Sequence, residues 1–460
     1  MANKSSKKSK IIALFQLPEA MLVGSFAGVI LAGAILLTLP WAARSQRISF
    51  VDALFTSTSA VCVTGLIVVD TGTAYSLFGQ IVILVLIQTG GLGIMTFAGL
   101  FFQLLLGRRM SLKSQALLHG SLFQQDVGVS FKQLFKQILW IMAITEFTGA
   151  VLLFAALLWG ATPPAQALFS SVFHSVSAFC NAGFSIYSDN LVGVRDSRLF
   201  TFTIMGLIII GGLGHVVVRE IGDKFRNGLQ AGGPGGPKRL SVHTRVVLRM
   251  SATLIVLGAL GLLILGLTNQ EPTWGVKIHS ALFQSVTART AGFNTVDIGA
   301  LPLASILLLI FLMFVGGSPA SCAGGIKTTA LAILLADLRA KLKGEKEARL
   351  LDRRISPDII ARVTLLVQLA IGWIVLGLFL LLVTEARTGI GLHDVLFELV
   401  SAFGTVGLST GITDKLTVTG KLWISATMFL GRLGPLTLAI WMFPKEQTHV
   451  KYPDGRILIG

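Results

Sequence analysis

The sequence predicts an all-α polytopic membrane protein: eight transmembrane helices in four membrane–pore-loop–membrane repeats, with fourfold pseudosymmetry around one central pore. Two observations predict this fold. The chain of 460 residues is 53% hydrophobic and only 13% charged, and apolar runs of about 20 residues, long enough to cross the hydrocarbon of a bilayer, recur along it. One short motif also occurs four times along the chain, and the glycines of successive copies lie 118, 109 and 115 residues apart.

The eight apolar runs are the expected spanning helices, and a shorter apolar segment lies inside each consecutive pair. The spans are expected at 20–41, 76–106, 134–160, 198–219, 247–268, 302–338, 360–384 and 420–443. The shorter segments, at 50–61, 165–179, 275–288 and 391–403, cannot reach across a bilayer and are typical of re-entrant half-helices. Each of them leads into one copy of the motif: Ser59 to Leu66, Ser177 to Phe184, Thr287 to Phe293 (one residue shorter) and Ser401 to Leu408.

The repeats divide the chain into segments. We expect an N-terminal cytoplasmic tail (1–19), repeat 1 (20–110), repeat 2 (134–227), a Gly/Pro linker (228–246), repeat 3 (247–340), a charged cytoplasmic segment (341–359), repeat 4 (360–443) and a C-terminal tail (444–460). In the charged segment, Lys341, Glu345 and Arg349 have helical spacing, which fits a solvated face or a docking surface for a soluble partner.

The basic residues predict the orientation. The loops expected on the same side of the membrane as the N-terminus hold 28 of the 38 lysines and arginines. The loops that carry the motifs, on the other side, hold 9. This bias predicts a multi-pass protein of the cell (inner or plasma) membrane with both termini in the cytoplasm. No basic soluble domain is present, so the net charge of +16 does not indicate nucleic-acid binding, and membrane lipid is the expected surrounding.

The motif has the chemistry of a cation filter. Rings of backbone carbonyls replace the hydration shell of a monovalent cation, and glycine permits the backbone angles that this requires. A packing role would explain any one glycine, but four at matched positions favour a pore. The predicted filter residues are Val63, Thr64, Gly65, Asn181, Ala182, Gly183, Thr290, Ala291, Gly292, Thr405, Val406 and Gly407.

The sixth predicted span is interrupted near mid-membrane. Glycines and a proline make continuous helix costly at Gly316, Gly317, Ser318, Pro319, Ala320, Ser321, Cys322, Ala323, Gly324 and Gly325. A packing kink is the alternative, but ten small and polar residues are too many for one. Arg432 lies well inside the eighth span, at a matching depth; it either opposes cation flow and binds loop carbonyls, or pairs structurally with a helix-end carbonyl or an acid.

An aspartate follows each filter glycine by five to seven residues. Four carboxylates around an outer mouth would concentrate cations, and aspartate also caps helices and turns; the two roles are compatible. The four residues are Asp70, Asp189, Asp297 and Asp414.

Several further polar residues fall in apolar segments. For His174, Glu398 and Arg289, pairing behind the filter is favoured over a pore-facing role. His215 and Arg219 are expected as interfacial anchors ending the fourth span. The cysteines Cys62, Cys180 and Cys322 have neither metal-ligand nor disulfide spacing and are expected as small buried side chains.

The four motif copies and the whole-chain pattern resemble the Trk/Ktr/HKT superfamily of potassium transporters, most closely its KtrB branch of bacterial Ktr membrane subunits. The resemblance implies potassium as substrate, sodium as an activator, and a homodimer with one pore per subunit. It also implies a cytoplasmic KtrA-type ring that binds ATP or ADP; the chain itself is expected to carry no cofactor and no metal beyond the transported potassium. The interruption at 316–325 resembles the family's gating loop, and the resemblance favours a gate role for Arg432.

Two other classes of protein fit less well. A membrane-embedded enzyme would cluster its polar residues, for example as His-Glu-x-x-His, and the sequence has no such cluster. An alternating-access symporter usually has twofold inverted repeats, which four like-oriented repeats oppose. Within the superfamily, a cation symporter of the wider Trk/HKT group, with sodium as a co-transported ion, remains the alternative function.

Overall fold

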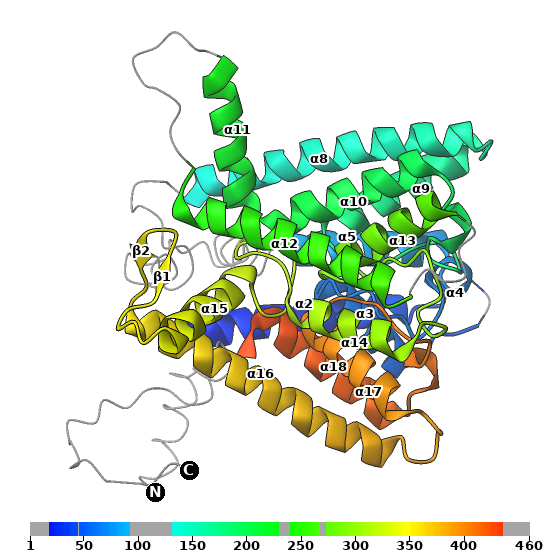
Figure 1. Ribbon diagram of the computed structural model, residues 1–460. Helices are drawn as coiled ribbons and strands as arrows, with labels where there is room; N and C mark the ends of the chain where they lie inside the picture. Colours follow the sequence, from blue (N-terminus) through cyan, green and yellow to red (C-terminus); the bar gives the residue numbers. More distant parts are fainter. Residues whose placement is uncertain (1–17, 45, 93–130, 230–239, 267–272, 436–460) are drawn as a thin grey trace, which may run out of the picture.

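The computed structural model describes residues 18–44, 46–92, 131–229, 240–266 and 273–435 (Figure 1). Several predicted segments lie partly or wholly outside these residues. They are most of the N-terminal tail (1–17), the end of the second predicted span and the loop that follows it (93–130), most of the Gly/Pro linker (230–239), a short stretch before the third half-helix (267–272), and the end of the eighth span with the C-terminal tail (436–460).

The helices follow one order four times: a long helix, a short helix, a non-helical segment with the motif, and a second helix. The first group is α2 (Pro18–Leu37), α3 (Phe50–Val61) and α5 (Leu77–Gly91), with the one-turn α4 (Thr71–Ala74) between the last two. The others are α8 (Phe131–Trp159), α9 (Pro164–Phe179) and α10 (Arg198–Leu213); α12 (Val242–Ile264), α13 (Trp274–Thr287) and α14 (Leu303–Phe314); and α16 (Pro357–Thr384), α17 (Leu392–Gly404) and α18 (Val418–Leu433).

The short helices α3, α9, α13 and α17 lie within one residue of the four predicted half-helices at each end. Local sequence explains two of their starts. The side chain of Ser49 accepts a hydrogen bond from the backbone N–H of Asp52 and caps α3. Pro164 stands at the first position of α9, where its missing N–H costs nothing.

Each short helix packs against the long helix of its own group. In the first three groups a serine of the short helix donates its hydroxyl to a carbonyl of the long helix and fills the space beside a glycine there. The sets are Ser57 with Ile30 and Gly33, Ser175 with Glu146 and Gly149, and Ser285 with Ile255 and Gly258. In the fourth group the apolar side chain of Leu399 fills the space beside Gly377.

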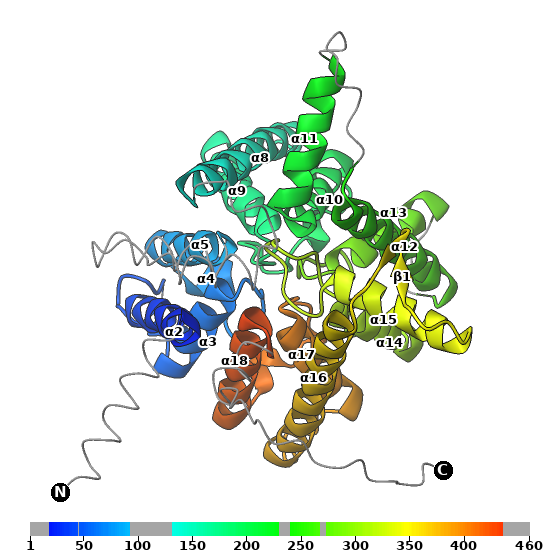
Figure 2. The same ribbon diagram turned by 90° about the vertical axis from the view of Figure 1, so that its left-hand side faces the viewer.

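The four groups are arranged around a common centre, as Figure 2 shows. The contacts between groups are cyclic: α5 packs on α9, α10 on α13, α14 on α17, and α18 on α3. The second helix of each group therefore contacts the short helix of the next, and the fourth group closes the circle onto the first.

Three single helices in the described ranges are long and apolar enough to cross a membrane, namely Phe135–Trp159 within α8, α12 and α16. Large apolar side chains project outward from them, with Phe147 71%, Ile264 81% and Val383 76% exposed. Side chains of this kind on the outer face fit a lipid environment rather than water.

The prediction of one straight span at 198–219 is wrong. α10 ends at Leu213, and the chain turns by 103° into α11 (His215–Leu229). The turn occurs at Gly214, whose φ is +84° and whose Cβ, if present, would lie 2.8 Å from the carbonyl oxygen of Pro319. Only glycine combines this angle with so close an approach of another backbone.

The charged segment 341–359 is also not the helix that its spacing suggested. α15 (Thr328–Leu342) ends beside Gly344, which has a φ of +69°. A small hairpin follows, with β1 (Arg349–Leu350) and β2 (Arg353–Arg354) joined by two residues of positive φ, the geometry of a tight hairpin turn. The expected linker also ends earlier than predicted, because α12 already begins at Val242, capped by Ser241.

Candidate functional site

The four motif glycines meet in a closed ring at the centre of the molecule. A Cβ atom on Gly65 would lie 2.5 Å from the carbonyl oxygen of Ala182, and one on Gly183 would lie 2.7 Å from that of Ala291. A Cβ atom on Gly292 would lie 2.4 Å from the carbonyl oxygen of Val406, and one on Gly407 would lie 2.1 Å from that of Thr64. The fourth contact leads back to the first segment and closes the ring. Real Cβ atoms do not approach backbone oxygen so closely, so each of the four positions requires glycine.

The backbone of all four segments has the same unusual conformation. The residue two places before each glycine has a left-handed backbone: Val63 (φ +56°), Asn181 (+59°), Thr290 (+77°) and Thr405 (+48°). The glycines also have positive φ, between +68° and +95°. Left-handed angles at β-branched residues cost of order 1–3 kcal/mol and persist where the surroundings hold them, which is common at functional sites.

The surroundings hold these segments through the short helices. The hydroxyl of Ser59 accepts a hydrogen bond from the N–H of Gly65 at 3.0 Å, and that of Ser401 accepts one from Gly407 at 3.1 Å. In the second copy Ser177 instead donates to the carbonyl of Phe184 at 2.8 Å. The predicted filter side chains are all buried, so the backbone, rather than the side chains, forms the ring.

Each short helix ends one to three residues before the first predicted filter residue of its motif. Helix C-terminal ends carry partial negative charge from unpaired carbonyls. Four such ends beside a ring of backbone carbonyls give a site that favours cations over anions.

The interruption predicted in the sixth span is a non-helical segment from Val315 to Lys327, between α14 and α15, and we call it the central loop. Its Gly324 lies beneath the fourth motif segment: a Cβ there would lie 3.0 Å from the carbonyl oxygen of Gly404. A Cβ on Gly316 would lie 3.2 Å from Cγ2 of Thr290, in the third segment. The central loop therefore lies against two of the four ring segments.

The central loop is also bonded to helices of the first and second groups. The N–H groups of Ser318 and Cys322 donate to the carbonyls of Gly212 and Gly211, at 3.0 and 3.3 Å, and the thiol of Cys322 lies 3.4 Å from the carbonyl oxygen of Gly91. These bonds join the loop to the ends of α10 and α5.

Arg432 of α18 completes these contacts. It is 8% exposed; its guanidinium donates to the carbonyl of Cys322 in the central loop and, at 2.6 Å, to the carbonyl of Gly90 at the end of α5. The sequence suggested either a bond to loop carbonyls or a pairing with a helix-end carbonyl or an acid. The side chain of Arg432 makes both kinds of carbonyl contact.

His215 and Arg219 do not anchor the end of a span. Both lie on α11 beyond the bend. His215 donates from Nδ1 to the carbonyl of Ala320 in the central loop at 3.0 Å, and Arg219 bonds Gln137 at 3.2 Å. His215 is therefore a further contact of the central loop.

Three polar residues near this site were missed by sequence reasoning. Lys327 ends the central loop and donates to the carbonyl of Ala323 at 2.6 Å. Glu146, the one acidic residue of the predicted span 134–160, accepts from Gln88 of α5 at 3.0 and 3.2 Å. The signal that could have found Glu146 and Lys327 is the same one that singled out Arg432: a charge inside an apolar run.

His174 and Glu398, on two of the short helices, are paired behind the ring, as favoured. His174 contacts the hydroxyl of Ser185 at 2.9 Å and stacks on Tyr187, and Glu398 accepts from the hydroxyl of Thr413. All three cysteines are buried and free, as expected.

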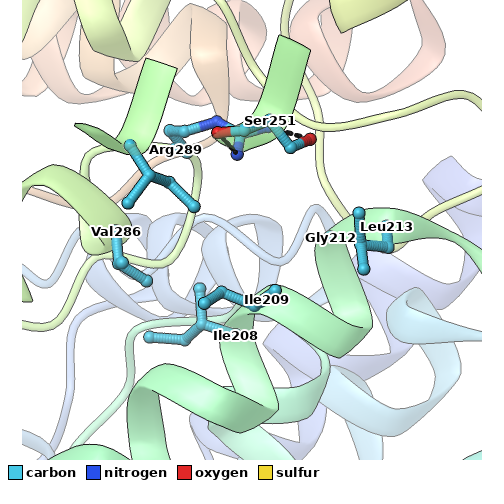
Figure 3. Close-up of a pocket in the computed structure, with 8 residues that line it drawn as sticks. Ile208, Ile209, Gly212, Leu213, Ser251, Val286 and Arg289 are labelled. Atoms are coloured by element: carbon cyan, nitrogen blue, oxygen red, sulfur yellow. Dashed lines mark hydrogen bonds between the residues drawn. The ribbon is translucent and has the colours of Figure 1, made fainter. Parts of the chain in front are cut away.

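Arg289 points away from the ring, toward α12. Its guanidinium donates to the carbonyl and hydroxyl of Ser251 at 3.4 and 3.2 Å. Figure 3 shows it with Ser251 at one side of a small cavity whose remaining lining is apolar and includes Ile208, Ile209 and Val286. Among the described residues it has no acidic partner at ion-pair distance.

The four aspartates follow the ring along the chain, and two of them cap local structure. Asp70 accepts from the N–H of Thr73 at 2.7 Å and caps α4, and Asp297 accepts from the N–H of Gly299 at 2.9 Å. Asp189, Asp297 and Asp414 are exposed, and Asp70 is half-buried.

Comparisons with known proteins agree with this architecture. Residues 21–450 match the family model "TrkH: Cation transport protein". The chain is 37% identical to the Ktr system potassium uptake protein B of Bacillus subtilis, over 99% of both chains, and 36% identical to that of Vibrio alginolyticus, over 95% of this chain and 93% of the relative. It is 36% identical to the potassium/sodium uptake protein NtpJ of Enterococcus hirae, over 96% and 97%. The crystal structure of the potassium transporter TrkH from Vibrio parahaemolyticus has the same fold, with a TM-score of 0.68 over 92% of this chain and 84% of that one, at 21% identity.

Proposed function

Because the chain belongs to the TrkH family of cation transport proteins, we propose that it takes up potassium through a pore on the axis of the glycine ring. It is a transporter of the membrane and not an enzyme. The observation that carries the proposal is the ring itself, in which four glycine backbones touch the carbonyls of their neighbours in one closed circle.

In this proposal the predicted filter residues, from Val63–Gly65 to Thr405–Gly407, supply the carbonyls that replace potassium's water. The carbonyls of Thr64, Ala182, Ala291 and Val406 lie nearest to neighbouring glycines and are the first candidates. Selection by carbonyl rings depends on their spacing and field strength, and the left-handed residues fix that spacing.

The pore is surrounded by eight spans in four repeats with fourfold pseudosymmetry. The repeated order of helices and the cyclic contacts from α5–α9 to α18–α3 support this arrangement. We also propose that both termini are cytoplasmic and that the motif segments open to the outside, which the distribution of lysine and arginine supports.

The central loop, with the predicted gate residues 316–325, closes the pore on the cytoplasmic side of the ring. Its contacts with α5, α10, α18 and two ring segments support this role. Arg432 holds the loop in place and sets a positive charge beside the ion path. Outside the ring, Asp70, Asp189, Asp297 and Asp414 raise the local concentration of cations, since three of them are exposed.

Regulation is proposed to come from a second polypeptide. The relatives' name, "Ktr system", implies a multi-component system; we propose a homodimer that binds a cytoplasmic KtrA-type ring carrying ATP or ADP, with sodium as activator. The second candidate is a symporter that co-transports sodium, and the name of the Enterococcus relative, a potassium/sodium uptake protein, favours it.

The test is rubidium uptake into potassium-starved cells that lack their own potassium transporters. Gly292→Ser puts a side chain where Cβ meets the carbonyl oxygen of Val406 at 2.4 Å, whereas Gly372→Ser on α16 meets no atom within 4 Å and is the matched control. We expect uptake to fall strongly in the first variant only, and to become faster and unregulated when residues 316–325 are deleted. If the native chain, with a KtrA-type partner, restored no growth at low potassium, the proposal would be wrong.

A further inference from the structure

Glu398 is a buried carboxylate with an unused oxygen. It lies on α17, 1% exposed; one oxygen accepts from the hydroxyl of Thr413, and the other, Oε2, has no hydrogen-bond partner among the described residues. The only other fully buried acid in the described part of the chain, Glu385 (3% exposed), uses both oxygens, on Thr417 and Thr384. Buried carboxylates without full pairing are costly and need an explanation.

The partners of Glu398 belong to the segment that leaves the fourth ring position. The hydroxyl of Thr413 lies 3.0 Å from that of Ser409, which is two residues beyond Gly407, and Ser409 accepts from the N–H of Gly411 at 3.0 Å. Glu398 thus ties this exit segment to α17. On the other side of the ring position, Ser401 of the same helix holds the N–H of Gly407.

The second motif copy has a neutral version of this arrangement. His174 stands nine residues before its motif glycine, as Glu398 does in the fourth copy. His174 contacts the hydroxyl of Ser185 at 2.9 Å, and Ser185 stands two residues after that glycine, as Ser409 does. In both copies, therefore, one side chain of the short helix is linked to the exit segment.

The equivalent positions of the other two copies carry no acid. Thr56, in the first copy, accepts from the hydroxyl of Tyr75 at 3.1 Å. Gln284 occupies the position in the shortened third copy, and neither atom of its amide has a partner among the described residues. Among the residues at these four equivalent positions, only Glu398 has a carboxylate.

We propose that Glu398 is a positioning residue for cation selectivity, which rests on the proposed potassium pore. Its bond to Thr413 holds the exit segment, and so helps to keep Thr405, with its left-handed φ of +48°, in the geometry that aims the fourth carbonyls. Its second oxygen is an acceptor without a hydrogen-bond partner among the described residues. Because selectivity depends on the spacing and field strength of the carbonyls, loosening one side of the ring admits the smaller sodium ion.

The test compares Glu398→Gln with Glu385→Gln, the matched control, in rubidium uptake with sodium as competitor. Glutamine keeps the shape and the oxygen that accepts from Thr413 but removes the charge. We expect Glu398→Gln to raise the apparent KM for rubidium and strengthen sodium inhibition about three- to tenfold, the size of the difference between a charge-assisted and a neutral hydrogen bond. Maximal rate and membrane abundance should stay within about twofold, as should all readouts in Glu385→Gln.

Ser409→Ala tests the same link from the exit segment and avoids a change in the short helix. It should change sodium competition in the same direction, and the double variant with Glu398→Gln should be less than additive. Unchanged sodium competition in Glu398→Gln, or full additivity in the double variant, would overturn the inference. Failure of the native chain to take up rubidium would instead refute the proposed function, so the two failures are distinguishable.

Discussion

Replacing Arg432 with glutamine is expected to loosen the central loop and increase resting uptake. The guanidinium donates to the carbonyls of Cys322 and Gly90, and therefore joins the loop to the end of α5 across the centre of the molecule. Glutamine is shorter and uncharged, so it can replace at most one of these bonds and removes the positive charge beside the ion path.

The size of the effect follows from the bonds that are lost. Hydrogen bonds from a charged donor contribute about 1.5–3 kcal/mol each. If only one of the two is lost outright, the closed arrangement is weakened by about 2 kcal/mol, or roughly 30-fold in the ratio of closed to open protein. A protein that is closed about 99% of the time at rest would then be open about a quarter of the time.

The assay is rubidium uptake in cells without the regulatory partner, in which the native chain should be slow. The graded series is Arg432→Lys, which keeps the charge but not the two-armed donor, followed by Arg432→Gln. Lys421→Gln is the control, because it removes a charge from the same helix about 16 Å away at 1.5 Å per residue. Resting uptake in Arg432→Gln that equals that of the native chain, at equal membrane abundance, would refute the role of these bonds.

Two further predictions concern charges on either side of the ring. Changing all four outer aspartates to asparagine should raise the apparent KM for potassium, most strongly at low ionic strength where charges are least screened, and an unchanged KM would exclude the funnel. Glu146→Ala should lower thermal stability in detergent, because the half-buried Gln88 loses its acceptor. The loss should lie at or below the low end of the about 1–3 kcal/mol that an unpaired, fully buried group costs. Glu146→Gln should restore most of that loss, and equal stability of the two variants would contradict the reasoning.

Local sequence was sufficient to predict the short helices and to single out the four glycines that lie together at the centre. The half-helices were predicted to within one residue at each end, because each is a short apolar run that ends three to five residues before a motif glycine. The resemblance to the Trk/Ktr/HKT superfamily is confirmed by the family match over residues 21–450. Four copies of the motif support the assignment better than one, because a wrongly assigned copy would not lie at the similar intervals that separate the others.

Features that depend on distant contacts could not be predicted in this way. The bend at Gly214 requires glycine, because the carbonyl of Pro319, about a hundred residues later, occupies the space where a side chain would begin. The 198–219 run is apolar enough to suggest one span, and nothing local shows where the central loop will lie. Lys327 was missed for the same reason, since its bond to Ala323 is formed only when the loop folds back.

The central loop also explains why the four copies are not identical. The residue three places before the ring glycine is Cys62 in the first copy, Cys180 in the second, Arg289 in the third and Gly404 in the fourth. At Gly404 a side chain would collide with the carbonyl of Met313, at 2.6 Å, and the loop's Gly324 and Gly325 pack against its backbone, so only glycine fits.

At the same position the third copy has a large side chain instead of glycine. Arg289 fits there because it extends away from the loop to Ser251 on α12. One asymmetric segment beneath a nearly symmetric ring thus requires different residues at equivalent places. The ring positions themselves remain glycine in all four copies, because there each repeat meets the next in the same way.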